Sequence, residues 1–488
     1  MKEQFPALIV TVPLLSSFIV SISGWIRRSL CFYITLSVLI LINIFSFSIL
    51  NQVIGTGVIN YRLGGWEPPW GIAYHVDHLN ALMLCVISVV SLLNLISTKK
   101  AVERDMEEKR GAFYTLYTLM ITGLLGITIT GDAFNLYVLL EIASLTGYGL
   151  IAIGEDRAVL SSLNYLYMGT IGACFYLLGI GYLYIITGSL NMIDISHILP
   201  SLYNSKAVMV AFVICMVGLW IKMALFPLHG WLPNAYTHAY ASSSSLIAPL
   251  MTKVMVYVML RVMFSIFTPE YIFRYINPGR MIVWLSISAI FFGAVMALSQ
   301  KNIKRMFTFI IVSEIGYMVG GAWIGNRVAF TGCIFHMVND ALMTLGAFLF
   351  LGILSHNNID ATFEGIKGLT KRMPFTMGAF ILCALSFIGV PPTSGFFSKW
   401  YLLLGAMDAG YYGFMLALIV SSLINVILFF RIIESAYFYG HDASEIREAE
   451  LFELVPLFMV VAIILIVGLL NAELVQYIID PAIPKIII

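Results

Sequence analysis

Charged side chains are scarce in this sequence. Aspartate, glutamate, lysine and arginine make up only 11% of the 488 residues, whereas a soluble protein carries about 25%. Hydrophobic residues make up 60%, and many apolar runs reach the roughly 20 residues that a helix needs to cross a bilayer. The sequence therefore predicts an all-α polytopic membrane protein, because an outer-membrane barrel would show short alternating segments instead.

Motifs for metals, cofactors and nucleic acids are also missing. The six cysteines lie singly in apolar runs, and no CxxC or Cys/His cluster is present that would hold zinc, haem or an iron–sulfur centre. There is no nucleotide-binding loop and no catalytic nucleophile set. The net charge of +1 gives no reason to expect a nucleic-acid partner. We therefore expect no metal and no cofactor, and any redox chemistry would lie in other chains.

The apolar runs, separated by polar breaks, predict about fourteen transmembrane segments. These lie near residues 5–23, 29–54, 78–97, 111–131, 132–154, 159–188, 206–240, 241–266, 278–299, 301–323, 327–356, 374–407, 411–438 and 451–479. We expect a single integral membrane domain (1–488) made of three N-terminal segments (1–110), a first repeat (111–266), a second repeat (278–438) and a last segment (451–488).

Basic residues predict which side of the membrane each segment end faces. If the N-terminus lies outside the cell, these fifteen lie on the cytoplasmic side: Arg27, Arg28, Lys99, Lys100, Arg104, Lys109, Arg110, Arg157, Lys301, Lys304, Arg305, Lys367, Lys371, Arg372 and Arg447. About seven lie on the other side, which is the asymmetry that the positive-inside rule expects. The sequence thus predicts a multi-pass protein of the cell membrane with both termini outside.

Three lysines, Lys222, Lys253 and Lys399, lie deep inside apolar runs. A lysine at the bilayer centre costs roughly 2.5–3.5 kcal/mol on insertion scales. We expect a chain that retains such residues to move charge with them. A structural alternative is that they pair with buried carboxylates inside the bundle.

Two of these lysines lie beside proline breaks. Lys222 precedes Pro227 by five residues and His229 by seven, so His229 is expected to return to nearly the same helical face. A second apolar run is also interrupted by proline, at Pro391 and Pro392, and there the lysine, Lys399, follows the break. Broken helices in lipid are tolerated where they face protein or a wet cavity. Two broken, lysine-bearing segments predict two inverted five-helix repeats, which is a transporter architecture.

Carboxylates and a histidine also fall inside the predicted segments. Glu141 and Glu314 lie near the middle of theirs, while His336 and Asp340 are four residues apart and so stack on one helical face. Ionisable residues inside a membrane are rare and costly, so they indicate a functional site more often than a purely structural one. The alternatives are a structural partner for a buried lysine and a satisfied structural hydrogen bond.

Other charges have simpler explanations. Residues 55–80, which include Gly64, Gly65, Pro68 and Pro69, predict an external turn or hairpin after the second segment. Asp77 lies where this run meets the third segment, and we expect it at a solvated loop edge rather than at an ion entry point. Arg261 is expected to snorkel to the membrane interface. Arg431 and Glu434, three residues apart, are expected to pair with each other. Asp132 is either a helix N-cap or a functional carboxylate, and the sequence leaves the two equal.

Three motifs carry a family resemblance. They are LFPLHGWLPNAY after Lys222, TKVMVYVMLR around Lys253, and GGWEPPWGI ahead of Asp77. Together they resemble the D-type subunit of the multisubunit Mrp cation/proton antiporters, and also the antiporter-like subunits of respiratory complex I and of membrane-bound hydrogenases. The resemblance covers nearly the whole chain. It implies a subunit that moves protons, coupled to Na⁺/H⁺ antiport or to a redox module, with other membrane subunits as partners.

The resemblance also implies which residues act. Glu141 matches the family's glutamate of the fifth segment, Lys222 the lysine of the broken seventh, and Lys253 the lysine of the eighth. His336 matches the first histidine of an HxxNH-type motif, and Lys399 the lysine or glutamate of the broken twelfth segment.

The chain departs from the family pattern at three positions. Asp340 stands in place of the usual second histidine, Thr344 where many relatives carry lysine, and Glu314 where relatives often have histidine or glutamine. The centre is therefore more acidic than usual, and the choice between proton and sodium as the coupling ion stays open.

The sequence leads to one mechanistic hypothesis. Lys222 takes a proton from the cytoplasmic side and passes it through Lys253 and the histidine–aspartate pair to Lys399, which releases it outside. Movement of Glu141 toward or away from Lys222 would load or release the proton, because two charges 4 Å apart attract by about 4 kcal/mol at an effective dielectric near 20. The alternatives are a non-conducting scaffold subunit and a stand-alone carrier of a small solute.

Overall fold

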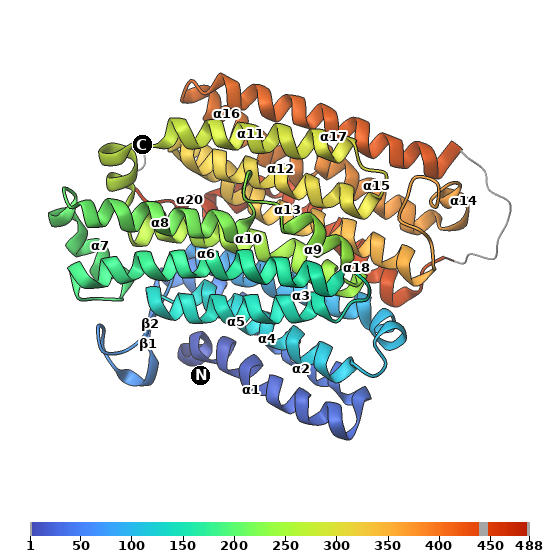
Figure 1. Cartoon of the computed structure of the whole chain (residues 1–488), viewed down its shortest axis with the longest axis horizontal. Helices are drawn as coiled ribbons and strands as arrows, with labels where there is room; N and C mark the ends of the chain where they lie inside the picture. The colour runs from blue at the N-terminus through green and yellow to red at the C-terminus, as the bar shows by residue number, and fades with distance from the viewer. Residues whose placement is uncertain (1, 439–447, 486–488) are drawn as a thin grey trace.

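The computed structural model describes residues 2–438 and 448–485 as a bundle of long helices that run along a common direction (Figure 1). Thirteen helices in the described part are long and apolar enough to cross a membrane. They are α1 (Phe5–Ile26), α2 (Arg28–Thr56), α3 (His78–Asp105), α4 (Arg110–Ile129), α5 (Ala133–Ala152), α6 (Ala158–Thr187), α8 (Lys206–Met223), α10 (Ala241–Ser265), α11 (Gly279–Leu298), α12 (Ile303–Ile324), α13 (Arg327–His356), α17 (Tyr412–Phe438) and α18 (Leu451–Leu469).

Shorter elements connect or extend these helices. The α-helices are α7 (Met192–Ile198), α9 (Leu232–His238), α14 (Leu369–Arg372), α15 (Pro374–Ile388), α16 (Ser394–Asp408), α19 (Asn471–Leu474) and α20 (Asp480–Ala482). The 3₁₀ turns are η1 (Lys2–Gln4), η2 (Leu63–Gly65) and η3 (Leu199–Leu202), and the π-helical turns are η4 (Tyr271–Ile276) and η5 (Val475–Ile479). The strands are β1 (Ile59–Arg62) and β2 (Ala73–Val76).

The all-helical membrane fold predicted from the sequence is confirmed. Thirteen of the fourteen predicted segments each contain one of the long apolar helices. The remaining segment, 374–407, is split into α15 and α16. The division into two inverted repeats stays a prediction.

The first break separates α8 from α9. The helix α8 ends at Met223, where Ala224 takes a left-handed conformation with φ 63°. The Ile221 carbonyl in the last turn of α8 accepts from the Ala224 amide at 3.2 Å and from the Trp231 indole Nε1 at 3.0 Å, so the loop after the break is tied to the helix end. Because the helix stops before His229, the prediction that His229 shares the helical face of Lys222 is wrong.

The second break separates α15 from α16. Gly389, with φ 90°, ends α15, and a non-glycine residue would be strained in that conformation. The Phe387 carbonyl in the last turn of α15 accepts from Lys399 Nζ at 2.7 Å and from Asn425 Nδ2 at 3.2 Å. The break therefore provides a polar acceptor inside an otherwise apolar layer.

The innermost helices are α10, α12 and α13. The apolar stretches of α10 and α12 are completely buried and that of α13 is 94% buried, whereas those of α1 and α2 are 39% buried. Figure 1 shows α1 and α2 at the lower edge of the bundle and α17 at the upper edge. Lys253, Glu314, His336 and Asp340, which these helices carry, therefore lie in the interior of the protein rather than against lipid.

The segment after α2 folds as the expected hairpin. Strands β1 and β2 are antiparallel, with Ile59 opposite Val76 and Arg62 opposite Ala73. The Gly131 amide donates to the Ala73 carbonyl at 3.0 Å, which joins the hairpin to the loop between α4 and α5.

Both described ends of the chain lie toward the same end of the bundle in Figure 1. An even number of crossings gives this arrangement. The side of the membrane that this end faces stays a prediction, and Arg447, one of the residues used for it, lies outside the described residues.

Candidate functional site

Lys222 contacts Glu141 at one edge of the bundle interior. Lys222 lies in the last turn of α8, and its Nζ is 3.3 Å from Glu141 Oε1 and 2.8 Å from Ser144 Oγ on α5. The lysine side chain is 2% exposed and the glutamate side chain 23% exposed. Glu141 therefore has room to move away from the lysine, while Ser144 would stay as a hydrogen-bond partner.

Two glycines bring α6 and α8 into close contact beside Lys222. A Cβ on Gly218 would lie 2.5 Å from the Gly172 carbonyl oxygen, and a Cβ on Gly172 would lie 3.1 Å from Cγ of Lys222. A side chain at Gly172 would therefore crowd the stem of Lys222, and one at Gly218 would push α6 away from α8.

Lys253 and Asp340 form an ion pair at the centre of the bundle. Lys253 Nζ on α10 lies 3.0 Å from Asp340 Oδ2 on α13, and both side chains are 0% exposed. The ammonium also contacts the Ala248 carbonyl at 3.2 Å and Thr344 Oγ1 at 3.4 Å. Thr344 in turn donates to Asp340 Oδ1 at 2.8 Å. The sequence placed these residues on a relay but did not pair them with each other.

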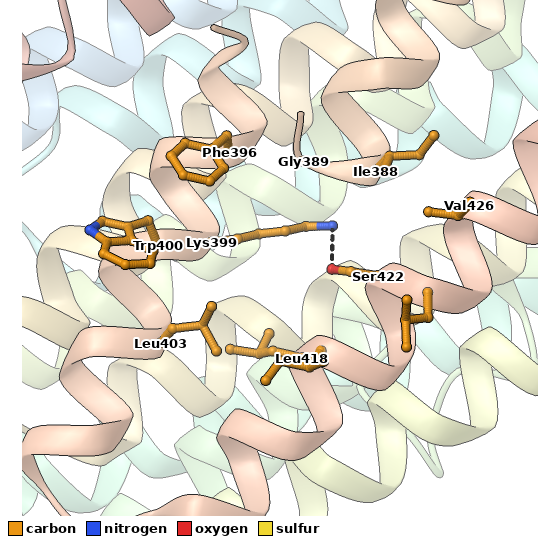
Figure 2. A pocket seen from close by; sticks show the side chains of 11 residues that line it. Ile388, Gly389, Phe396, Lys399, Trp400, Leu403, Leu418, Ser422 and Val426 are labelled. Atoms are coloured by element: carbon orange, nitrogen blue, oxygen red, sulfur yellow. Dashed lines mark hydrogen bonds between the residues drawn. The ribbon is translucent and has the colours of Figure 1, made fainter. Parts of the chain in front are cut away.

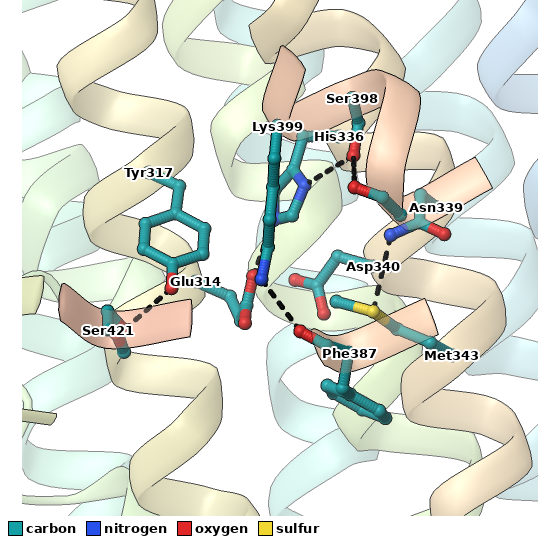
Figure 3. A network of polar contacts seen from close by, with 12 residues as sticks. Glu314, Tyr317, His336, Asn339, Asp340, Met343, Phe387, Ser398, Lys399 and Ser421 are labelled. Atoms are coloured by element: carbon teal, nitrogen blue, oxygen red, sulfur yellow. Dashed lines mark hydrogen bonds and ion pairs between the residues drawn. The ribbon is translucent and has the colours of Figure 1, made fainter. Parts of the chain in front are cut away.

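His336 links α12, α13 and α16. Its Nε2 lies 2.5 Å from Glu314 Oε2, and its Nδ1 lies 3.0 Å from Ser398 Oγ (Figure 3). Ser398 also lies within hydrogen-bond distance of the Gly395 carbonyl, at 3.1 Å. The single hydroxyl proton can serve the histidine or the carbonyl, so the ring can change its protonated nitrogen without a change of partners.

The second oxygen of Glu314 has no hydrogen-bond partner among the described residues. Glu314 and His336 side chains are both 0% exposed. A buried carboxylate with an unfilled acceptor is costly unless it can take up a proton or a water molecule. This part of the site therefore has spare capacity to bind a proton.

Lys399, on α16, differs from Lys222 and Lys253 in its surroundings. Its Nζ donates to the Phe387 carbonyl at 2.7 Å and to Ser422 Oγ at 3.2 Å, and it lies 5.3 Å from the centre of the Tyr317 ring. No carboxylate lies within 4.0 Å of it in the described part of the chain. The ammonium is therefore held by dipoles and an aromatic face, without a counter-ion.

A cavity of about 230 Å³ opens beside Lys399. Figure 2 shows the lysine reaching toward Ser422 between apolar side chains such as Leu418 and Ile388. Apart from Lys399 and Ser422, the lining is apolar or aromatic. The Lys399 side chain thus reaches into an apolar recess in which the Ser422 hydroxyl is its one side-chain hydrogen-bond partner among the lining residues.

Several sequence predictions need correction. His229 lies outside α8 and is half-buried against the rings of Phe226 and Phe292, with centroid distances of 5.4 and 4.7 Å, while its functional role stays a prediction. Arg431 donates to the Leu298 carbonyl at 3.2 Å and lies over the Phe363 ring, rather than pairing with Glu434 in the described structure.

The predictions for Asp77 and Arg261 are wrong as well. Arg261 is 4% exposed and forms an ion pair with Asp77 at 2.8 Å, so it does not snorkel and Asp77 is not a solvated loop residue. Burial raises the pKa of Asp77, but the Arg261 guanidinium and the backbone amides that it accepts from outweigh burial, and its pKa is below the usual value. Asp132, left open by the sequence, caps α5 by accepting from the Asn135 amide at 2.7 Å.

Sequence reasoning missed the hydroxyl and amide groups around the ionisable residues. Ser144 is three residues from Glu141, and helical spacing could have placed both on one face. Ser398 directly precedes Lys399, but its contact with His336 joins two helices and has no local signal. Asn339, which accepts from Ser386 and Ser394 at 2.9 and 2.6 Å, was also missed.

A comparison with protein families identifies the chain. The model described as NADH:quinone oxidoreductase/Mrp antiporter, TM matches residues 130–425. The chain belongs to this antiporter-like family. The matched region begins just before α5 and ends within α17. It includes the eight candidate residues of the predicted proton path: Glu141, Lys222, His229, Lys253, Glu314, His336, Asp340 and Lys399.

Relatives of this antiporter-like chain come from two kinds of complex. It is 40% identical over 438 residues to the N-type subunit of NADH-quinone oxidoreductase from Desulforudis audaxviator, covering 87% of each chain. It is 29% identical over 431 residues to the D-type subunit of the Na⁺/H⁺ antiporter from Alkalihalophilus pseudofirmus, covering 87% of this chain and 86% of the relative. The sequence motifs resemble both kinds of subunit.

Solved structures share the antiporter-like fold. The chain aligns with a chain of the Mrp complex from Dietzia sp. with a TM-score of 0.89 at 23% identity, covering 99% of this chain and 96% of that chain. It aligns with a chain of an archaeal membrane-bound sulfane sulfur reductase with a TM-score of 0.89 at 27% identity, covering 98% and 96%. For respiratory complex I from Thermus thermophilus the TM-score is 0.84 at 20% identity, covering 98% of each.

Proposed function

We propose that this antiporter-like chain carries protons across the cell membrane as one subunit of a larger assembly. The observation that carries the proposal is the fully buried Lys253–Asp340 pair, which lies between the Lys222–Glu141 pair and the group around His336 and Lys399. The helices that hold these groups run from α5 in the lower half of Figure 1 to α16 near its top.

The second half of the path is nearly continuous. Asp340 and His336 are one helical turn apart on α13. His336 contacts Ser398, and the next residue along α16 is Lys399. The groups between Lys253 and Lys399 are thus the carboxylates of Asp340 and Glu314, the imidazole of His336 and the hydroxyl of Ser398.

Charge pairing provides the driving force for proton transfer at Lys222 and Lys253, which each have a carboxylate partner. Burial disfavours the ammonium form of a lysine, while a carboxylate at about 4 Å favours it by about 4 kcal/mol at an effective dielectric near 20. A shift of Glu141 away from Lys222 therefore releases the Lys222 proton toward the centre. Ser144 holds the neutral amine in place after the shift, because it stays within hydrogen-bond distance.

Proton transfer through this chain is coupled either to Na⁺ transport in the opposite direction or to a redox module in other chains. Relatives named as an antiporter subunit and as a quinone oxidoreductase subunit support both couplings. We infer that the chain works beside other membrane subunits, with both termini outside the cell and two inverted five-helix repeats (111–266 and 278–438). Proton transfer through Glu141, Lys222, Lys253 and Lys399 is common to either coupling.

Transport by neutral variants tests the proposal. We expect Lys222→Ala and Glu141→Ala to lower proton transport by roughly a hundredfold, the lower end of the range for a lost proton-transfer group. Transport is measured in everted membrane vesicles that contain the whole assembly, with a dye that reports the pH gradient. Arg62→Gln, which removes an exposed ion pair with Glu67 on the hairpin, is the control.

The same experiment separates the proposal from a scaffold subunit. A scaffold would assemble less well when Lys222 or Glu141 is replaced and would show normal transport per assembled complex. Full transport per complex in both variants would overturn the proposal. A stand-alone carrier would transport after purification as a single chain, whereas we expect the single chain to be inactive.

A further inference from the structure

A second cluster of buried and partly buried polar groups surrounds the part of α10 beyond Lys253, with members from α10, α4 and the start of α3. This outer cluster consists of Asp77, Asn80, Thr128, Tyr257, Arg261 and Ser265. Arg261 lies eight residues after Lys253, which is about 12 Å along a helix, and Tyr257 lies between them. The proton path proposed above does not use these residues, although they lie between Lys253 and the hairpin end of the bundle.

All five hydrogen-bond donors of Arg261 are occupied. The two terminal nitrogens donate to the two oxygens of Asp77 at 2.8 and 2.9 Å. Their other hydrogens reach Ser265 Oγ at 3.1 Å and Asn80 Oδ1 at 2.7 Å. Nε donates to the Tyr257 hydroxyl at 3.3 Å. Because a guanidinium has five N–H donors, none is left to bind a water molecule.

Tyr257 and Asn80 are saturated in the same way. The Tyr257 hydroxyl donates to the Thr128 carbonyl at 2.7 Å and accepts from Arg261 and from Asn80 Nδ2, the latter at 3.0 Å. The second amide hydrogen of Asn80 reaches the Thr128 carbonyl at 2.6 Å, and its oxygen accepts from the Asp77 amide and from Arg261. No proton or lone pair of these two side chains is free.

This saturation contrasts with the groups of the proton path. Glu314 has an unfilled acceptor, and Ser398 can place its proton on either of two partners. Proton hopping needs groups that can accept, reorient and release. Arg261 cannot release a proton in a protein, and a fixed guanidinium repels cations that approach it.

We propose that the outer cluster is a proton barrier that insulates Lys253 from the outside and directs its proton sideways toward His336 and Lys399. This inference rests on the proposed role of Lys253 as a proton carrier. Without the barrier, the stretch of α10 from Lys253 past Arg261, whose side chains lie about 12 Å apart along the helix, would become a direct path to the hairpin end. Protons would then leak across without driving the coupled process.

Passive proton leak tests the barrier. The double variant Asp77→Asn/Arg261→Gln removes both charges together, so that neither is left buried alone. Everted vesicles that contain the full assembly are charged with a pH gradient, the driving reaction is stopped, and the rate of gradient decay is followed. We expect the decay to be roughly tenfold faster per assembled complex, which corresponds to about 1.4 kcal/mol of barrier.

Two further variants provide a second test of the barrier and a matched control. Tyr257→Phe retains the ring and frees the donors of Arg261 and Asn80 to bind water, so it should also leak, and it serves if the double variant does not assemble. Arg327→Gln/Asp480→Asn removes an exposed Arg–Asp pair, 3.2 Å apart, and should not leak. A normal decay rate in assembled Tyr257→Phe and double-variant complexes would overturn the inference. A comparable leak in the control pair, or a leak of Na⁺ as large as that of protons, would also overturn it.

Removal of Lys253 distinguishes this inference from the proposed function. Adding Lys253→Met/Asp340→Asn to the leaky double variant should restore slow decay, because the leak passes through Lys253. A leak that persists would refute the barrier above Lys253 and leave the proton path untouched. Full transport by Lys222→Ala and Glu141→Ala would instead refute the proposed function, whatever the leak.

Discussion

Lys253 and Asp340 come from helices α10 and α13 and meet 3.0 Å apart with no exposed side-chain surface. Two buried charges of opposite sign are costly to desolvate, and a well-packed apolar pair is often equally stable or more stable. Stability alone therefore does not explain the pair. The proposed proton transfer between these residues and their neighbours gives the pair a function that apolar residues would not have.

Lys399→Met should leave the protein as stable as the native chain or more so. Lys399 has no carboxylate within 4.0 Å in the described structure, so its loss leaves no unpaired charge behind. Proton transport should nevertheless fall by roughly a hundredfold. Thermal unfolding of the purified assembly and vesicle transport measure the two effects. Lower stability with unchanged transport would show that Lys399 is structural.

Ser398→Ala should slow transport through its effect on His336. The substitution leaves Nδ1 of the buried histidine without its partner, at a cost of about 1–3 kcal/mol. We expect the pH profile of transport to change, because the hydroxyl that exchanges a hydrogen bond with Nδ1 is lost. Ser386→Ala is the matched control, since that buried serine contacts Asn339 and not the histidine. Identical pH profiles for both variants would contradict the role of Ser398.

Gly218→Ala should disturb the first lysine by pushing α6 from α8. A Cβ at Gly218 would lie 2.5 Å from the Gly172 carbonyl, and overpacking of this kind costs about 1–3 kcal/mol. Transport and melting temperature should both fall. Gly181→Ala on α6 is the control, because a Cβ there meets nothing within 4 Å. Equal effects of both substitutions would argue against the close contact.

The Asp77–Arg261 pair should stay intact across the physiological pH range. The pKa of Asp77 is lowered in the folded protein, so its contribution to stability is present above the unfolded value of about 3.9 and is lost as pH falls through the lower folded value. The difference in melting temperature between native protein and Asp77→Asn should therefore be constant from about pH 5 to 8. A difference that disappears near neutral pH would contradict the charged pair.

The sequence predicted which residues are unusual better than it predicted their partners. A charge inside an apolar run is visible in a window of about 20 residues, so Lys222, Lys253, Glu141 and the two breaks were found. The pairing of Lys253 with Asp340 joins two distant helices, and no local spacing encodes it.

The errors have the same physical origin. His229 was placed on the face of Lys222 because a continuous helix was assumed, whereas α8 ends at Met223. The prediction for Arg261 treats it as an isolated charge near the end of its helix. Its partner Asp77 caps α3, far away in the sequence, and no local pattern connects the two residues.

The most direct test of the account is proton transport by Lys253→Met/Asp340→Asn, which removes the central pair without leaving a buried charge. Asp340→Asn alone would leave Lys253 unpaired and cost about 3–5 kcal/mol, so the double variant is the cleaner choice. The account predicts that the double variant assembles with its partners in native amounts and loses proton transport. Native transport rates in the assembled double variant would contradict it.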